Sequence, residues 1–271
     1  MRKHLEDLYL GPLPLVAPSS DRRFVWEPSQ RQVRVVFDGE TLAQSTHVML
    51  LLEAGRLPVY YFPRADVCAG ALERTDHTTP SALKGPATFW TVRVGEHVAE
   101  NAAWSHETPP ADGPEMAGYV AFYWDMMDAW YEEDERAYAH ARDPYKLIDV
   151  RQSSRHVRVE LAGVTVAETC RPRLLFETGL PARYYIPRED VRMDLFEPSA
   201  TTTQCAYKGQ ASYWSARIGG RLYEDVVWSY HEPLALAAQV KDDIGFFQER
   251  EGTLVEVDGE PVERPHTPWS S

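Results

Sequence analysis

The sequence predicts a mainly β protein of the α+β class, made of two tandem small domains. Each domain is expected to be a β-sandwich or barrel-like fold that is closed by a C-terminal helix. Three observations support this prediction: an internal repeat at a fixed offset, many short apolar runs separated by turn residues, and a helical periodicity after the last strands of each repeat.

The internal repeat is clearest in residues 60–67, which read YYFPRADV and return as YYIPREDV in residues 184–191. The offset is 124, because Arg64 recurs as Arg188 (188 − 64), and no gap is needed over residues 33–105. Self-similarity at one offset indicates a single domain type written twice. We therefore expect a lead-in segment over residues 1–30, a first repeat over 31–135, a linker over 136–154 and a second repeat over 155–271.

The first repeat opens with an apolar run at residues 33–37 that ends in Asp38 and Gly39, a pattern typical of a strand entering a tight hairpin turn. Further strands are expected over residues 41–45, 47–53, 57–62, 87–94 and 98–104. The second repeat follows the same plan, and residues 254–262 alternate like one more strand and hairpin. Short strands at this spacing are typical of a sandwich or a barrel.

Each repeat then changes to steps of three and four residues, which predicts an amphipathic closing helix. The first helix is expected to start near residue 114, and its apolar face consists of Met116, Tyr119, Val120, Tyr123, Met127 and Trp130. The second helix is expected to be shorter, with Val240, Ile244 and Phe247 on its apolar face and Gly252 as its stop.

Composition places the chain among ordinary globular proteins, with 44% hydrophobic and 25% charged residues. A net charge of −13 disfavours a phosphate backbone as partner, so we predict no nucleic-acid binding. The charged start of the chain does not resemble a signal peptide, and no apolar run reaches the length of a membrane span. We therefore predict no membrane partner and a cytoplasmic location.

The three cysteines, Cys68, Cys170 and Cys205, form no C-x-x-C pair, and the repeat does not conserve any of them between its copies. A disulfide framework or a zinc site is therefore not expected. No set of ligands with metal spacing is visible either, so we predict no metal and no cofactor.

Polar and aromatic residues that both copies keep are the candidate ligand-binding residues. Tyrosine and tryptophan supply flat walls, arginine and lysine bind carboxylates or phosphates, and hydroxyl groups fix orientation. In the second repeat the candidates are Tyr185, Arg188, Thr203, Cys205, Tyr207, Lys208, Trp214, Trp228 and Ser229. In the first repeat they are Tyr61, Arg64, Thr79, Lys84, Trp90 and Trp104.

The same residues also have a structural interpretation. Arg64 and Asp66 lie two apart on an extended segment and can pair, and the tryptophans can belong to the core. We favour this interpretation for the Arg64 and Asp66 positions and for the tryptophans, and the functional one for the polar cluster at residues 202–208.

Catalytic signatures are mostly absent, since the chain has no G-x-S-x-G, no H-E-x-x-H and no Walker-type loop. Cys205 lies three residues from Lys208, which can lower the pKa of a thiol. Because Ser81 replaces Cys205 in the first repeat, such chemistry would belong to one copy only.

With these motifs in view, the chain resembles the bacterial and fungal family called domain of unknown function 427, sometimes labelled nucleotidyltransferase-like. The matching stretches are residues 184–191, 202–209, 211–215 and 225–230, with counterparts in the first repeat. The resemblance implies small, mainly β domains with a C-terminal helix, often found in tandem. The paired aspartates of nucleotidyl transfer are not visible.

Three hypotheses follow from the sequence. The first is binding of a small polar or anionic molecule in an aromatic and basic cleft. The second is an enzyme acting on a small anionic or nucleotide-like substrate, in which Lys208 and Arg188 stabilise developing negative charge. The third is a structural or protein-interaction module. A duplicated pair can reproduce a dimer-like interface within one chain, so a pseudo-twofold arrangement is expected and both a monomer and a homodimer stay open.

Overall fold

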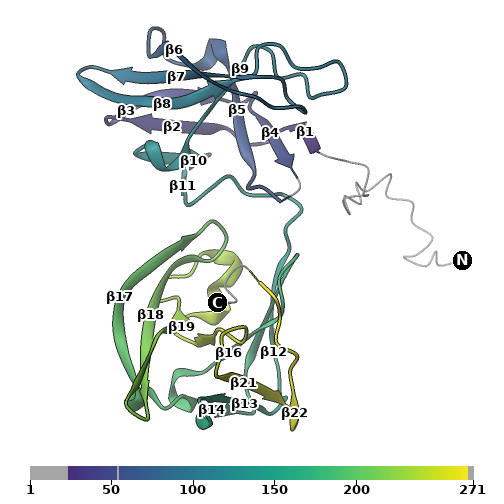
Figure 1. Ribbon diagram of the computed structural model, residues 1–271, viewed down its shortest axis with the longest axis vertical. Helices are drawn as coiled ribbons and strands as arrows, with labels where there is room; N and C mark the ends of the chain where they lie inside the picture. Colours follow the sequence, from purple (N-terminus) through teal and green to yellow (C-terminus); the bar gives the residue numbers. More distant parts are fainter. Residues whose placement is uncertain (1–23, 54, 268–271) are drawn as a thin grey trace, which may run out of the picture. The chain divides into compact units, whose positions relative to one another are not determined.

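The computed structural model describes residues 24–53 and 55–267. The chain divides into two compact units, residues 1–136 and residues 137–271, called unit 1 and unit 2 here (Figure 1). The expected lead-in segment falls mostly outside the described residues, and its last part forms strand β1 (Phe24–Pro28). Each unit contains a seven-stranded and a four-stranded antiparallel sheet, so the mainly β tandem prediction is confirmed.

Unit 1 is built from strands β1 to β11. Its seven-stranded sheet has the order β1 (Phe24–Pro28), β4 (Met49–Glu53), β5 (Val59–Pro63), β9 (Tyr119–Phe122), β8 (His97–Ser105), β7 (Ala87–Val94) and β6 (Leu72–Thr79). Its four-stranded sheet has the order β11 (Glu135–Ala137), β10 (Ala129–Glu132), β2 (Val33–Phe37) and β3 (Glu40–Ser45). Two 3-10 turns are η2 (Arg64–Asp66) and η3 (Trp124–Met126).

Unit 2 repeats this topology strand for strand. Its seven-stranded sheet has the order β12 (Ile148–Gln152), β15 (Arg173–Glu177), β16 (Arg183–Ile186), β20 (Ile244–Phe246), β19 (Arg221–Ser229), β18 (Gly209–Ile218) and β17 (Phe196–Cys205). Its four-stranded sheet has the order β14 (Val164–Thr169), β13 (Val157–Leu161), β21 (Thr253–Val257) and β22 (Glu260–Pro261). Its 3-10 turns are η4 (Arg188–Asp190), η5 (Met193–Leu195) and η6 (Ala235–Val240).

The predicted hairpin at residues 33–45 is present, and its turn shows why the sequence requires it. Asp38 and Gly39 have φ values of 53° and 72°, which is the left-handed conformation that a tight two-residue hairpin turn demands. Phe37 pairs directly with Glu40 across this turn. Ala162 and Gly163 turn the matching hairpin of unit 2 with φ values of 52° and 79°.

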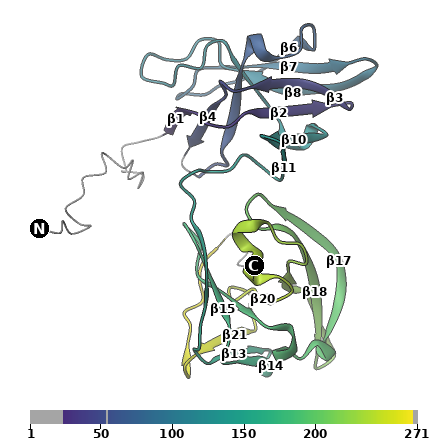
Figure 2. The same ribbon diagram turned by 180° about the vertical axis from the view of Figure 1, so that it is seen from behind.

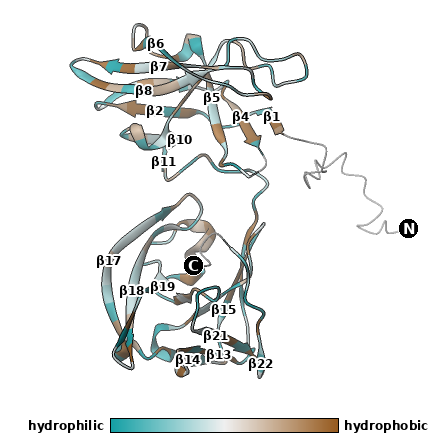
Figure 3. Ribbon diagram, in the orientation of Figure 1, coloured by the Kyte–Doolittle hydropathy of each residue, from teal (hydrophilic) through white to brown (hydrophobic). Residues whose placement is uncertain are grey.

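The core of each unit lies between its two sheets. In unit 2 it combines Val157, Val159 and Leu161 of β13 with Ile186, Trp214 and other residues of the larger sheet. Strands β2 and β13 alternate buried and half-buried residues, so one face of each strand points into this core. Figure 3 shows the same alternation as brown and teal segments along the strands. The described sheets stay open at their edges, so neither described unit forms the closed barrel that was one of the two expected forms.

The predicted closing helix of the first repeat is wrong. Tyr119 and Val120 belong instead to β9 and Trp130 to β10, while Tyr123 and Met127 flank η3 and Met116 precedes β9. Gly118, with a φ of 84°, precedes β9, and β9 is buried on both faces, because Val120, Ala121 and Phe122 are all inaccessible. A strand buried on both sides carries a continuous apolar run, and such a run imitates helical spacing.

The predicted second helix is also wrong in length and position. The 3-10 turn η6 ends at Val240, and Ile244 already belongs to strand β20. Asp242, with a φ of 61°, turns the chain between these two elements. Figures 1 and 2 both show η6 as a short coil inside the curve of β17 and β18, where Ala237 and Val240 pack against the sheet.

Candidate functional site

The site residues predicted for unit 2 fall into two groups on opposite faces of the seven-stranded sheet. Tyr185, Tyr207 and Trp228 lie in a buried cluster that also includes η6, and Cys205 packs against it. Trp214 lies in the core between the two sheets. Since neighbouring residues of a strand point to opposite faces, the nine predicted residues do not line one cleft. The face that carries Trp228 in unit 2, and Trp104 in unit 1, is called the aromatic face below.

The aromatic face is organised by a tryptophan–tyrosine pair in each unit. The indole Nε1 of Trp228 donates to the hydroxyl of Tyr185 at 3.1 Å, and that of Trp104 donates to the hydroxyl of Tyr61 at 3.0 Å. The rings meet edge to face, with centroids 6.1 and 6.2 Å apart. Burial raises the pKa of both phenols well above the usual range, so the hydroxyls stay protonated and accept the indole hydrogen bond.

Lys84 is held by the half-buried Glu53 of β4, and Lys208 by the buried Glu177 of β15. The ammonium of Lys84 lies 2.7 Å from Glu53 Oε2, and Lys208 pairs with Glu177 in the same way. Lys146 adds a second cation to Glu177, at 3.0 Å from Oε1. Lys208 thereby connects the turn of the β17–β18 hairpin to β15, and Lys84 connects the turn of the β6–β7 hairpin to β4. The charge of each lysine is balanced by a glutamate within the fold.

Arg64 and Arg188 do not pair with the aspartates two residues later. Their guanidinium groups lie over the rings of Trp90 and Trp214, at 3.7 and 5.2 Å from the centroids. Asp66 instead accepts a hydrogen bond from Ser45.

In unit 2, Asp190 accepts from Thr169 at 2.7 Å and binds the guanidinium of Arg171. Arg171 lowers the pKa of the Asp190 carboxyl, while the head of Arg188 stays exposed.

The remaining candidates are spread over the sheet. Thr203 is exposed, and its hydroxyl lies 2.8 Å from that of Tyr213, while Thr79 is exposed at the end of β6. The Tyr207 hydroxyl accepts from the backbone N–H of Asp143 at 2.7 Å, and burial raises the pKa of Tyr207 to about 12. Ser229 is fully buried on the Trp214 side of β19.

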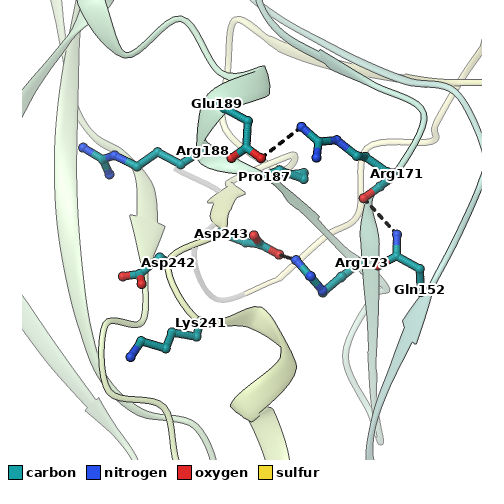
Figure 4. A pocket seen from close by; sticks show the side chains of 9 residues that line it. All are labelled: Gln152, Arg171, Arg173, Pro187, Arg188, Glu189, Lys241, Asp242 and Asp243. Atoms are coloured by element: carbon teal, nitrogen blue, oxygen red, sulfur yellow. Dashed lines mark hydrogen bonds and ion pairs between the residues drawn. The ribbon is translucent and has the colours of Figure 1, made fainter.

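An open, charged pocket of about 490 Å³ lies in unit 2 at the exposed head of Arg188 (Figure 4). It is formed where the end of β12, the start of β15, the η4 turn and the loop before β20 meet. Its lining residues are Gln152, Arg171, Arg173, Pro187, Arg188, Glu189, Lys241, Asp242 and Asp243.

Most charges of this pocket are paired. Arg171 binds Glu189 at 3.0 Å, Arg173 binds Asp243 at 2.5 Å, and Asp242 binds His231 at 2.7 Å. Burial raises the pKa of the Asp243 carboxyl, and the guanidinium of Arg173 opposes this shift.

Arg188 and Lys241 differ from the other cations of the pocket. Neither forms an ion pair with any residue that the structure describes, and neither is joined to another labelled side chain in Figure 4. The pocket therefore carries two cations without a carboxylate partner.

The pocket belongs to the second copy alone. Subtracting the offset of 124 places His47, Met49, Ala65 and Ala117 where unit 2 has Arg171, Arg173, Glu189 and Lys241. Of its charged residues only Arg188 has a charged counterpart, Arg64. Residues kept by both copies therefore do not indicate this pocket. The pattern in the sequence that does indicate it is the set of cations, Arg171, Arg173 and Lys241, that only the second copy has.

Two further findings concern metal ligands and membrane-spanning helices. Over residues 24–53 and 55–267, no group of His, Cys, Asp and Glu side chains is arranged to hold a metal ion. In the same ranges no helix has both the length and the apolar character needed to cross a membrane.

Comparison with known proteins gives one match. The model of the family described as Domain of unknown function (DUF427) matches residues 25–133 and again residues 149–260. The two matched ranges together cover more than half of the chain and coincide with the two sets of sheets. No curated protein matches the chain.

We predict that Gly245→Ala destabilises unit 2 by about 1–3 kcal/mol, because a core that is already filled must shift to accept a methyl group. A Cβ at this position would lie 2.6 Å from the Trp228 ring, which the Tyr185 hydroxyl holds in place. Urea unfolding of the full chain, followed by tryptophan fluorescence, measures the change. In the matched control Ala121→Gly, at the same place in unit 1, we expect a loss of about 0.5–1 kcal/mol. An unchanged unfolding midpoint for Gly245→Ala would show that the indole is free to move.

We predict that Lys84→Met and Lys208→Met both lower the melting temperature, because each removes a partner from a carboxylate that is half-buried (Glu53) or buried (Glu177), a change that costs about 1–3 kcal/mol. The loss should be smaller for Lys208→Met, since Glu177 keeps Lys146, whereas Glu53 keeps only Arg56, whose side chain is 70% exposed. Calorimetry of both variants tests the order. If Lys208→Met kept the wild-type melting temperature but lost ligand binding, Lys208 would have the binding role that the sequence suggested.

Proposed function

Starting from a chain that belongs to the DUF427 family, we propose that unit 2 binds a small anionic molecule, with a carboxylate or phosphate group, in the pocket between Arg188 and Lys241. The observation that carries this proposal is the pair of cations without a carboxylate partner among the described residues of an otherwise charge-paired pocket. An anion would supply the missing counter-charge.

The chemistry of the two side chains suits this role. A guanidinium offers a planar fork of donors that matches a carboxylate or phosphate, and an ammonium adds a compact charge that adapts to its position. The pocket volume of about 490 Å³ lies in the range of small-ligand sites. The ion pairs Arg171–Glu189 and Arg173–Asp243 would fix the walls, so that the fold does not have to reorganise on binding.

The aromatic and basic residues predicted from the sequence receive a supporting role in this proposal. Trp214 lies under Arg188 and would keep its head at the mouth of the pocket. Tyr185, Tyr207, Lys208 and Trp228 would hold the sheet and its hairpin in shape, and their counterparts Tyr61, Lys84 and Trp104 would do the same in unit 1.

One observation favours an alternative function, namely an enzyme that acts on the bound anion. Asp243 is a buried carboxyl with a raised pKa in the wall of the pocket, and such groups are frequent among catalytic acids and bases. Loss of turnover in Asp243→Asn with binding kept would identify this second function.

We also retain the cytoplasm as the proposed location of the protein. Cys68, Cys170 and Cys205 are all free thiols, and Cys68 and Cys170 are exposed, which suits a reducing compartment.

We predict that the double variant Arg188→Gln/Lys241→Gln loses the stabilisation that small anions give to the wild type. A thermal-shift screen with sulfate, phosphate, citrate and sugar phosphates measures it, because a ligand at a hundredfold excess over Kd adds about 2.7 kcal/mol of stability. Without ligand the double variant should stay within about 0.5 kcal/mol of wild type, as exposed substitutions usually do.

The matched control for this screen is Arg64→Gln, which changes the counterpart of Arg188 in unit 1 and should leave the anion effect intact. Stabilisation that persists in the double variant, or the absence of any stabilising anion for the wild type, would contradict the proposal.

We predict that anion affinity rises as the pH falls from neutral toward the ordinary pKa of aspartate, about 3.9. Burial raises the pKa of Asp243, so this carboxyl takes up its proton earlier than an ordinary aspartate on acidification and then releases Arg173 to the anion. Sulfate is the suitable probe for calorimetry, because its own charge does not change over this range.

One variant isolates the contribution of Asp243 to this pH dependence. Asp243→Asn should bind sulfate more tightly than wild type at neutral pH and show a flatter profile. An affinity that is constant or falls on acidification would show that the Asp243 carboxyl does not control access of the anion to Arg173.

A further inference from the structure

Strand β17 forms one edge of the seven-stranded sheet of unit 2. It pairs with β18 on one side, and no described strand pairs with it on the other. At ten residues it is among the longest strands in the structure, and Figure 1 shows it running along the outside of the unit. Its outward backbone N–H and C=O groups are therefore open to another strand.

The protection against strand pairing is confined to the start of β17, where Glu197 and Pro198 precede an irregularity in the pairing with β18 between Pro198 and Thr202. Residues 199–205 read SATTTQC and contain no charge and no proline, and the strand is drawn mostly teal to white in Figure 3. Proteins normally block a long edge strand with charges, prolines or a covering segment. An edge that keeps high β propensity without such protection is suited to a partner strand.

The corresponding edge of unit 1 is protected. Strand β6 contains Glu73, Arg74 and Asp76, and Pro80 follows directly after it. At the offset of 124, Asp76 becomes Ala200 and Pro80 becomes Gln204 in β17. The second copy therefore lacks the charge of Asp76 and the proline of Pro80, while it has Glu197 and Pro198 in the places of Glu73 and Arg74.

The side chains of β17 leave its edge accessible. The hydroxyl of Thr201 is bound to Asp225 at 2.7 Å, and that of Thr203 lies 2.8 Å from the Tyr213 hydroxyl. These polar groups are satisfied within their own sheet, so they do not compete with a partner strand for the exposed backbone groups at the edge.

We propose that β17 pairs antiparallel with β17 of a second copy of this chain, which joins two seven-stranded sheets into one across a twofold axis. A second copy fits because an isologous contact brings the same uncharged strand from both sides, and identical antiparallel strands are self-complementary. Each chain carries a net charge of −13, so two copies repel one another in general, and a neutral strand is where they can approach. This inference is independent of the anion-binding proposal.

Sedimentation velocity of the full chain over a wide range of concentration tests the proposal. We expect a reversible monomer–dimer equilibrium that shifts toward dimer when salt screens the charge repulsion. Thr202→Lys should weaken the dimer by about tenfold or more, because it places two ammonium groups beside one another at the twofold axis. This effect would be local, since an added lysine lowers the net negative charge of each chain.

The matched control is Thr78→Lys, which makes the same charge change at the equivalent position of β6 and should leave the dimer unchanged. Hydrogen exchange gives a second readout that does not depend on folding of the variants: amides of residues 199–205 in the wild type should exchange more slowly as the concentration rises. A chain that stays monomeric throughout, or a dimer that Thr202→Lys does not weaken more than Thr78→Lys, would overturn the proposal.

Discussion

The hydrogen bond from a tryptophan indole to a tyrosine hydroxyl sets the geometry of each larger sheet. In unit 2 it connects β19, through Trp228, to β16, through Tyr185, across the intervening strand β20. The indole lies directly against β20, and a Cβ at residue 245 would lie 2.6 Å from its ring. In unit 1 the same bond crosses β9, where Ala121 occupies the matching place. A strand crossed in this way is covered on both faces, which explains why β9 and β20 are almost completely apolar.

The two copies share this framework, but the segments around it differ between them. Both copies keep the lysine–glutamate pair and the arginine stacked on tryptophan, which connect strands that are distant in sequence. Beside them the first copy places Met49 and Tyr119, and the second copy places Arg173 and Asp243. The same fold therefore presents aromatic and apolar side chains in one unit and a charged pocket in the other. Duplication permits this, because one copy can change its surface while the packing of both stays the same.

The sequence allowed the strands and their turns to be predicted, because these depend on local signals. Asp38 and Gly39 specify their hairpin through positive φ values alone, and the match between the copies places each strand twice. The first helix could not be predicted correctly, because Val120 and Trp130 belong to a run with helical spacing in the sequence but are buried on strands β9 and β10. Their strand conformation follows from pairing with distant segments, Val120 with Phe62 of β5 and Trp130 with Val35 of β2, which a single segment does not reveal.

At the candidate site, most of the residues that both copies keep are not the ones that form the pocket. Residues kept in both copies were the candidates for a ligand site, yet Tyr185 and Lys208 form contacts within the sheet. Trp228, for which a core role was favoured, does the same. Arg188 is the exception, since its guanidinium lies over a tryptophan that both copies have and it also lines a pocket that only one copy has. In a duplicated protein, constraints of packing act on both copies, whereas a binding site needs to be built only once. In a chain of net charge −13, a pocket with two cations that keep no carboxylate partner is unusual, and so the differences between the copies are the more informative guide to function.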